Sequence, residues 1–370
     1  MIPRRLPSLA CAILAIFGCV AVAEQPPTRL SALRLTQPVE RAVFQRAGRD
    51  LGEVPVSGSL GVEKSDTLEV RVVNRQTQQT LTDWAVVATN SPDGSFNTQL
   101  SLPVGWYRIE VRSKSAGTVV ATATVERVGV GDVFVTCGQS NSANHGQPPQ
   151  KAGEDRVSTC DFQTGKWAHA DDPQPGATGA GGSPWPVLGD LLVRKTGAPV
   201  GFICVGVGGT PVSFWTPKGN GYPRLKRALQ LAGPHGVRAV LWHQGESDSI
   251  AGTTMEDYAR MLEQCIAQSR TDAGWMVPWG VALASFHPDP KATPTRQDAI
   301  VAGQKKVIAS VSAAFQGPST DSFHTRGWLC DTVHFNAEGL AAHAQGWAGA
   351  LAPLLDAGST FPDNKPTAKP

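Results

Sequence analysis

In Val133-Phe-Val-Thr-Cys-Gly138-Gln139-Ser140-Asn141-Ser142, an apolar run of strand type stops at a glycine and delivers a serine, flanked by two amides. We expect a tight turn from strand to helix at this point. Such a turn presents the hydroxyl of Ser140 as a nucleophile for acyl transfer. A serine that precedes a helix is also a frequent N-cap, so this stretch alone leaves both roles open.

Downstream of Gly131, continuous apolar runs alternate with helical patterns. The predicted strands cover residues 133–136, 200–207, 237–242 and 277–283, and the predicted helices lie near 184–195, 222–232, 255–269 and 296–314. Strands that are apolar on both faces are typical of a parallel sheet covered by helices. A last helix carries Leu340, Trp347, Leu351 and Leu354 on one side, with Asn336 as its expected N-cap. The pattern predicts an α/β domain over residues 130–356, followed by a flexible tail over 357–370.

Upstream of this domain the pattern is of short strands with a period of two. Leu68, Val70 and Val72 share one face of such a strand, and the turn signal Asn90-Ser-Pro-Asp-Gly94 separates it from later ones. Residues 24–129 are therefore predicted to form a small all-β sandwich domain.

The first 23 residues have the order of a secretory signal peptide. Arg4 and Arg5 precede an apolar run over residues 9–20, and Ala21-Val-Ala23 follows it. We expect cleavage after Ala23 and a secreted or periplasmic protein. A membrane anchor is the alternative, but the run is shorter than the roughly 20 residues of a spanning helix. A second alternative is a lipoprotein-type cleavage site that ends at Cys19.

Charge and cysteine content narrow the class of protein. The chain has 33 basic and 31 acidic residues, so removal of Arg4 and Arg5 leaves a formally neutral protein. A neutral chain argues against nucleic acid or an anionic membrane as partner. Five cysteines follow the signal peptide, namely Cys137, Cys160, Cys204, Cys265 and Cys330. In an oxidising compartment one or two disulfides are expected, with at least one thiol left over and the pairing open.

Three further blocks follow the ends of predicted strands or precede the last helix, where ligands bind in open parallel sheets. They are Gly206-Val-Gly208-Gly209-Thr210, Trp242-His-Gln244-Gly-Glu246-Ser247-Asp248 and Asp331-Thr-Val-His334. Acyl transfer by serine needs a base and a group that orients the base, and these are Ser140, His334 and Asp331. The oxyanion also needs donors, for which we expect the N–H of Ser140, the N–H of Gly208 and the amide of Gln244. Gly209 is an alternative to Gly208.

Several residues near these blocks have competing interpretations. Ser247 could replace Ser140 as nucleophile, although capping is the expected role. His243 and Glu246 could suggest a metal site, but they lack a third ligand at a typical spacing, and no metal is expected. Trp215 could stack on a sugar ring or pack in the core. His145 could enter the pocket, while a partly exposed loop position is the favoured interpretation.

The order of Gly-Gln-Ser-Asn, Gly-Gly-Thr, His-Gln-Gly-Glu-Ser-Asp and Asp-x-x-His-Phe resembles that of the SGNH hydrolase superfamily, in its branch of sialate O-acetylesterases and related carbohydrate acetylesterases. The resemblance implies a three-layer α/β/α domain and a cofactor-free Ser–His–Asp hydrolase that acts on O-acetylated carbohydrates, either sialic acid or acetylated polysaccharide. By position, Ser140, His334 and Asp331 resemble the triad, and Asn141 and Glu246 have supporting roles. Gln244 stands where the superfamily's name implies asparagine.

Two functions of different class are compatible with these residues. The first is a secreted serine esterase that removes acetyl groups from sugars through an acyl-enzyme. The second is a catalytically silent carbohydrate-binding protein with the same fold, in which Trp215 contacts the glycan. The presence of all three triad residues favours the esterase. No long apolar lid segment in the sequence supports a lipid substrate. The sugar and the oligomeric state stay open.

Overall fold

The computed structural model describes residue 1 and residues 33–48, 50–60, 67–89, 94–233 and 235–356. The predicted signal peptide, its cleavage site and the predicted tail lie outside these residues. The described residues between 33 and 356 cluster as one compact unit. A sandwich domain that is separate from the rest of the chain therefore stays a prediction.

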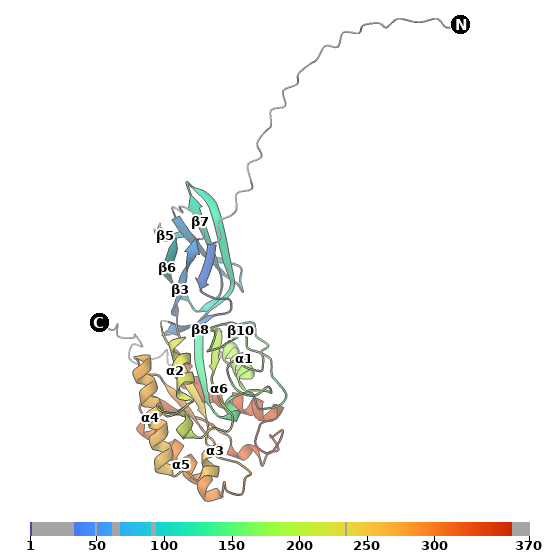
Figure 1. Cartoon of the computed structure of the whole chain (residues 1–370), viewed down its shortest axis with the longest axis vertical. Coiled ribbons are helices and arrows are strands. Elements are labelled where there is room, and N and C mark those ends of the chain that lie inside the picture. Colours follow the sequence, from blue (N-terminus) through green and yellow to red (C-terminus); the bar gives the residue numbers. More distant parts are fainter. Residues whose placement is uncertain (2–32, 49, 61–66, 90–93, 234, 357–370) are drawn as a thin grey trace. The chain divides into compact units, whose positions relative to one another are not determined.

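A largely parallel sheet organises the C-terminal two thirds of the chain (Figure 1). Its strands are β8 (Thr118–Gly138), β9 (Val157–Cys160), β10 (Trp167–His169), β11 (Val200–Cys204), β12 (Ala239–His243), β13 (Trp279–Leu283) and β14 (Ala314–Ser319). Their order is β10-β9-β11-β8-β12-β13-β14, and β10 pairs antiparallel at one edge. The strand that leads to Ser140 is thus central, between β11 and β12.

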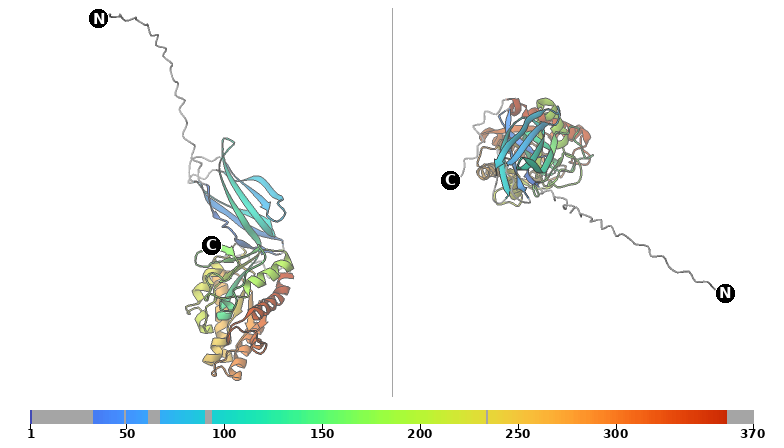
Figure 2. Two further views of the ribbon diagram at one scale, coloured as in Figure 1. Left: turned by 90° about the vertical axis from the view of Figure 1, so that its right-hand side faces the viewer. Right: turned by 90° about the horizontal axis from the view of Figure 1, so that it is seen from above.

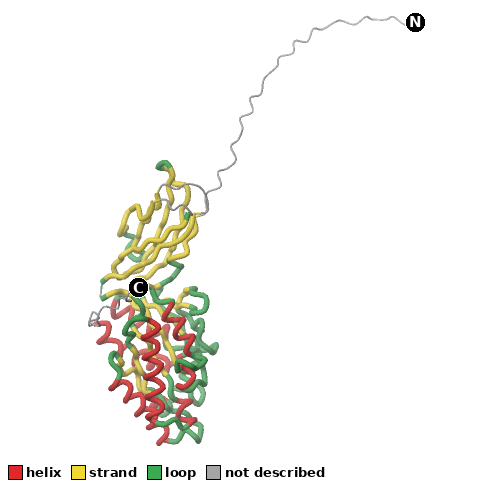
Figure 3. The backbone as a smooth tube through the Cα atoms, turned by 60° about the vertical axis from the view of Figure 1, so that its left-hand side comes forward, coloured by secondary structure: helices red, strands yellow, loops and turns green. Residues whose placement is uncertain are grey.

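Helices cover both faces of this sheet (Figures 2 and 3). They are α1 (Trp185–Thr196), α2 (Tyr222–Gln230), α3 (Glu246–Ala251), α4 (Met255–Ala273), α5 (Pro294–Ser310) and α6 (Ala337–Asp356). Because neighbouring residues of a strand point to opposite faces, Val133 and Val135 join a core with α2, α4 and α5, whereas Phe134 joins a core with α1 and α6. The mixed α/β arrangement predicted from the apolar runs is confirmed.

The N-terminal strands are antiparallel to one another. They are β1 (Leu33–Gln37), β2 (Val43–Ala47), β3 (Leu51–Leu60), β4 (Thr67–Asn74), β5 (Thr80–Thr89), β6 (Ser95–Pro103) and β7 (Gly105–Ser115). β3 pairs with β1 and β6, whereas β4 pairs with β5 and β7. Val54 and Val56 of β3 share one buried cluster with Val70 and Val72 of β4, as the period of two predicts.

β8 joins the two parts of the fold, because it pairs with β7 in its first half and with β11 and β12 in its second. The boundary predicted at residue 129 therefore falls inside one continuous strand. Near this point Asp132 is buried and forms ion pairs with Arg46 of β2 at 2.9 Å and with Arg238, which precedes β12, at 2.7 Å. The carboxylate links three chain segments that are distant in sequence.

The predicted elements agree with the structure in type but differ at several boundaries. The predicted helix over 296–314 ends at Ser310, and the short strand β14 follows, which the sequence pattern missed. The strand predicted over 200–207 ends at Cys204. Asn336 accepts a hydrogen bond from the Gly339 N–H at 3.0 Å, so its expected capping role is confirmed.

The five cysteines of the described residues are all free thiols. Cys137, Cys160, Cys204 and Cys265 are buried, and Cys330 is exposed. The expected disulfides are therefore not formed among these five residues. In the ranges that the structure describes, no helix is long and apolar enough to cross a membrane.

Candidate active site

The turn after β8 is built by a close approach of two backbones. Gly138 has φ of 130°, and a Cβ at this position would lie 2.0 Å from the carbonyl oxygen of His243 in β12. Only glycine fits there. The chain then forms a short 3₁₀ helix over Ser140–Ser142, so the Ser140 N–H is the first amide of that helix and has no acceptor within it.

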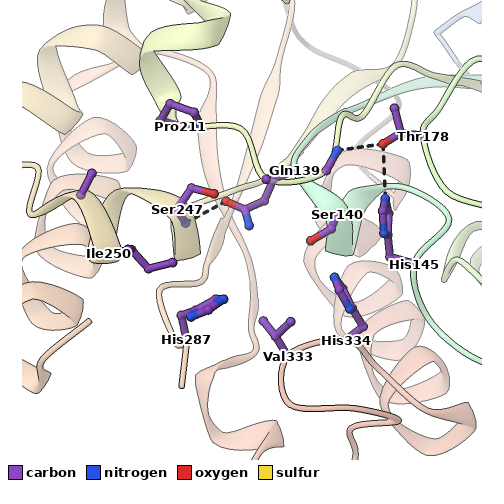
Figure 4. A pocket seen from close by; sticks show the side chains of 13 residues that line it. Gln139, Ser140, His145, Thr178, Pro211, Ser247, Ile250, His287, Val333 and His334 are labelled. Carbon is purple, nitrogen blue, oxygen red and sulfur yellow. Dashed lines mark hydrogen bonds between the residues drawn. The ribbon is translucent and has the colours of Figure 1, made fainter. Parts of the chain in front are cut away.

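Ser140 lies in a cavity of about 680 Å³ (Figure 4). The lining comes from six segments of the chain, with Gln139, Ser140, His145, Thr178, Gly208, Gly209, Pro211, Ser247, Ile250, Ala251, His287, Val333 and His334. The two segments that the sequence placed together, at 140 and at 331–334, do meet in this cavity. In Figure 4 the Ser140 hydroxyl and the His334 ring point into the same space.

The base-bearing loop is organised by Asp331. Its Oδ2 atom lies 2.7 Å from His334 Nδ1, and its Oδ1 atom accepts the backbone N–H groups of Val333 and His334 at 2.7 Å each. Partial burial alone would raise the pKa of Asp331, but these amides and the His334 ring outweigh it and lower the pKa. The ionised carboxylate holds the Nδ1 proton, which leaves Nε2 of a neutral His334 free to accept a proton.

His145 has the partly exposed loop position that the sequence favoured, and it also lines the cavity and lies against the base. Its ring stacks on His334 with centroids 5.2 Å apart, and its Nε2 atom lies 3.3 Å from Thr178 Oγ1. Burial, together with the charge of His334, lowers the pKa of His145 and so favours a neutral ring. No hydrogen bond between Ser140 and His334 is present among the described residues, an arrangement that unliganded active sites often show.

Two of the predicted oxyanion donors are already engaged elsewhere. The Gly208 N–H donates to Thr178 Oγ1 at 2.7 Å. The side chain of Gln244 is fully buried and donates to Asp248 Oδ2 at 2.6 Å, with further acceptors at 3.2 Å on Gln139 and Thr210. Both assignments are corrected, because neither donor is free to contact a ligand in the cavity.

A different glutamine faces the cavity. Gln139 Oε1 accepts the N–H of Ser247 at 3.1 Å and the amide of Gln244 at 3.2 Å. Since these donors hold the oxygen, the Nε2 group of Gln139 is turned away from them and into the cavity (Figure 4). Gly209 also lines the cavity, with φ of 68°. The sequence pointed to the block that contains Gln244 and missed that Gln139 is the glutamine that lines the cavity.

Glycine at 208 has a steric explanation that differs from the predicted one. A Cβ there would lie 2.8 Å from His145 Nε2. The residue makes room for the stacked imidazole and donates to Thr178. His287, which the sequence also did not single out, accepts the Asp289 N–H on Nδ1 at 3.0 Å. Its Nδ1 atom therefore carries no proton, and the ring lines the cavity.

The structure gives each of the remaining candidate site residues a distinct environment. Trp215 is fully buried and packs edge-on against Trp242, so its predicted contact with sugar is corrected to a core role. Ser247 belongs to α3 and lines the cavity, but Gly245 is the N-cap, without a side-chain cap. His243 and Glu246 bind each other at 3.2 Å. Among the described residues, no group of three or more His, Cys, Asp or Glu side chains could hold a metal ion.

A family model matches more than half of the chain. Residues 130–352 match the model described as "Carbohydrate esterase, sialic acid-specific acetylesterase". The matched region contains every residue of the cavity. A search of curated proteins finds no match.

Solved structures share the fold at low sequence identity. A novel carbohydrate acetylesterase from Xanthomonas citri is 17% identical, with a TM-score of 0.58, over 88% of this chain and 76% of the other. A protein from Arabidopsis thaliana is 20% identical, with a TM-score of 0.49, over 60% of this chain and 98% of the other. A family 3 carbohydrate esterase from Clostridium thermocellum is 13% identical, with a TM-score of 0.39, over 61% and 98%. Only the Xanthomonas citri structure is similar enough to support an argument, and it supports the fold alone.

Proposed function

The chain belongs to the family of carbohydrate esterases described as sialic acid-specific acetylesterases, and from this premise we propose that it removes O-acetyl groups from sugars through Ser140, His334 and Asp331. The observation that carries the proposal is the single cavity in which a serine at the end of β8 meets a histidine already paired with a carboxylate. This set of groups suits acyl transfer.

In the first step Ser140 Oγ attacks the acetyl carbonyl carbon while its proton passes to Nε2 of His334. The resulting imidazolium is stabilised by Asp331, whose Oδ2 atom already lies 2.7 Å from Nδ1. His145 adds a stacked neutral ring to the other side of this cation.

The negative charge that develops on the carbonyl oxygen needs donors that are in place beforehand. We assign this role to the Ser140 N–H, the Nε2 group of Gln139 and the backbone N–H of Gly209. Support comes from the fixed orientation of the Gln139 amide and from the location of all three residues on the cavity wall. Collapse of the tetrahedral intermediate breaks the ester bond, and His334 returns the proton to the departing sugar oxygen.

The second half repeats the chemistry with water. His334 removes a proton from a water molecule, the hydroxide oxygen attacks the acetyl-Ser140 carbonyl, and collapse releases acetate and returns the proton to Ser140 Oγ. The substrate proposed is an O-acetylated carbohydrate, either an acetylated sialic acid or an acetylated polysaccharide. We also propose that the protein is exported, on the basis of the signal-like order of residues 1–23.

Acetate release is the direct test. The purified protein is incubated with an activated acetyl ester, with O-acetylated sialic acid and with O-acetylated xylose and galactose derivatives, and free acetate is measured enzymatically. The parent should release acetate from the activated ester and from at least one sugar. A fluorophosphonate probe followed by peptide mass spectrometry should modify Ser140 and leave Ser247 unmodified.

The outcomes separate the alternatives. Acetate release with the probe on Ser247 would overturn the nucleophile assignment. Absence of release from every ester, with sugar binding retained in calorimetry, would favour the carbohydrate-binding protein instead.

A further inference from the structure

A continuous line of buried polar side chains runs behind Ser140 and ends on the loop that carries His334. Asn141 Nδ2 donates to Glu246 Oε1 at 2.9 Å, and that oxygen lies 3.2 Å from His243 Nε2. His243 Nδ1 lies 3.1 Å from His343 Nε2, to which the indole of Trp347 donates at 3.0 Å. Each of these side chains is buried, and His243 and His343 are completely so.

The donors and acceptors of this line place its protons. The indole N–H of Trp347 can only donate, so His343 Nε2 accepts and carries no proton. His243 lies with its Nδ1 atom 3.1 Å from this same nitrogen, whose one lone pair the indole already engages. Its other nitrogen faces Glu246 Oε1, and two acceptors would repel each other there unless one proton lies between them. A proton is therefore shared by His243 and Glu246.

The charge on this pair follows from the surroundings of the carboxyl group. Burial alone would raise the pKa of Glu246, but the neighbouring His243 and the hydrogen bond from Asn141 help to lower it. Glu246 is accordingly the carboxylate of the pair, and its Oε1 atom accepts the proton-bearing Nε2 of His243 at 3.2 Å. A buried carboxylate is costly unless hydrogen bonds satisfy it, and here His243 and Asn141 both supply them.

The carboxylate fixes which way the Asn141 amide points. An ionised carboxylate accepts hydrogen bonds and cannot donate, so Asn141 must turn its NH₂ group toward Glu246. The same nitrogen then donates to the backbone carbonyl of Val333 at 3.2 Å. Val333 directly precedes His334, on a loop whose Asp331 side chain is 49% exposed. An exposed loop is thereby tied to the residue that follows the nucleophile.

We propose that Asn141 and Glu246 are positioning residues, which hold His334 in place relative to Ser140 through the Val333 carbonyl and depend on the hydrogen-bonded His243–Glu246 pair for their orientation. The inference rests on the proposed esterase function, because the positioned group is its general base. Reacting groups that are misplaced by about 1 Å lose on the order of 100-fold in rate. The effect should fall on kcat, since neither Asn141 nor Glu246 lines the cavity.

The test compares four variants, Asn141→Ala, Asn141→Asp, Glu246→Gln and Glu246→Ala, in the full chain. With the activated acetyl ester, the two alanine variants should lose about 10- to 100-fold in kcat with KM changed by less than about threefold. Glu246→Gln should lose less, because its amide oxygen can still accept from Asn141.

Asn141→Asp gives the sharpest readout, because it keeps the shape of the side chain but reverses its hydrogen bonding. A carboxylate at 141 would face Glu246 and the Val333 carbonyl with no hydrogen to donate. Its kcat should therefore fall below that of Asn141→Ala. If Asn141 only fills space, the near-isosteric aspartate should be the milder change, and that result would overturn the proposal.

Ser249→Ala is the matched control for lost stability. Ser249 is also buried on α3, where its hydroxyl oxygen lies 2.8 Å from each of the backbone carbonyls of Glu246 and Ser285 and donates to one of them. It should lower the melting temperature without a comparable loss of kcat. Equal kcat losses in this control and in Asn141→Ala would show that general destabilisation explains both, and the positioning role would be rejected.

A double variant checks that the two residues act in series. Asn141→Ala combined with Glu246→Ala should lose no more kcat than the worse single variant, whereas fully multiplied losses would contradict one shared path. Failure of the proposed esterase function gives a distinct result, because the parent protein itself would then release no acetate. If the parent is active and all four variants match it, only the positioning role fails.

Discussion

The two halves of the candidate site are held by different parts of the molecule. Ser140 follows a central strand, is 5% exposed, and sits at a turn fixed by the contact between Gly138 and the backbone of His243. Asp331 and His334 lie on a loop outside the sheet, where the Asp331 side chain is 49% exposed. Sheet pairing therefore fixes the nucleophile, and a few hydrogen bonds fix the base. Changes to the buried contacts of the strand should alter folding, whereas changes in the loop should alter catalysis alone.

Ser140→Ala is expected to have the largest effect on turnover. Removal of the nucleophile should reduce kcat by about 10⁴-fold or more, as loss of a triad serine does in other hydrolases. The melting temperature should stay within a few degrees, because only one hydroxyl is removed. Acetate release and thermal unfolding measured on the same sample check both points. Turnover within tenfold of the parent would rule Ser140 out as nucleophile.

Asp331→Asn should come next and tests the loop half of the comparison. The amide keeps the shape but can present an N–H to His334 Nδ1, which favours the wrong tautomer, so kcat should fall by about 10³- to 10⁴-fold. Stability should change little, since the side chain is half exposed. A large drop in melting temperature would show that the loop is part of the folding core and would remove the contrast between the halves.

Asp132→Asn tests the strand half. The substitution removes the buried carboxylate charge that pairs with the guanidiniums of Arg46 and Arg238, which should cost about 3–5 kcal/mol in the free energy of unfolding. Chemical denaturation measures this loss. The kcat of the molecules that remain folded should equal that of the parent, because Asp132 lies at the far end of the strand segment that leads to Ser140.

The same carboxylate predicts a dependence of stability on pH. Burial alone would raise the pKa of Asp132, but Arg238 and Arg46 outweigh it and lower the pKa in the folded protein. A lowered folded pKa gives stability that is present above the unfolded value of about 3.9 and is lost as the pH falls through the folded value. Acid denaturation of the parent should therefore be steeper below about pH 4 than that of Asp132→Asn.

Gln139→Leu should reduce kcat by about 10²- to 10³-fold, the usual cost of one oxyanion donor. Gln244→Leu serves as its counterpart, since the buried Gln244 amide has its hydrogen bonds within the fold. This second change should lower the melting temperature more than Gln139→Leu does. If Gln244→Leu loses far more kcat than Gln139→Leu at equal folded fraction, the original assignment of Gln244 is restored.

His145 should give the smallest effect. His145→Phe keeps a ring beside His334, whereas His145→Ala removes it, and stacked aromatic pairs are worth about 0.5–1.5 kcal/mol. His145→Ala should therefore lose about 2- to 10-fold in kcat/KM, and His145→Phe should recover part of it. A loss beyond about 100-fold in both variants would indicate that His145 takes part in proton transfer.

The sequence predicts the framework well because burial on both faces leaves a continuous apolar pattern. The runs that contain Val135, Phe202 and Val240 became β8, β11 and β12 at the expected places. β14 was missed because Gly317 and Pro318 interrupt its apolar pattern and the preceding helix pattern extends into it. The continuity of β8 was also missed, since the change from an exposed to a buried environment along one strand looks like a domain boundary.

The site was predictable only at the level of which segments meet. Parallel strands end at one edge of the sheet, so the sequence alone could predict that Ser140 and His334 lie close together. Which donors are free could not be predicted, because that depends on partners elsewhere in the chain. For example, the hydroxyl of Thr178, 30 residues before Gly208, accepts the hydrogen bond from the Gly208 N–H. Likewise nothing in the local sequence of Trp215 distinguishes a buried indole from one that faces a sugar.

The four buried thiols have a consequence for handling the protein. Burial raises the pKa of Cys160 and of Cys204 to about 12, so almost no thiolate forms while the chain is folded, and oxidants have little to attack. Thermal unfolding exposes these side chains together, and the pKa of each thiol then returns to the ordinary value of about 8.5. In air the unfolded molecules would then form disulfide cross-links. Thermal unfolding would become irreversible, and its apparent midpoint would depend on the scan rate.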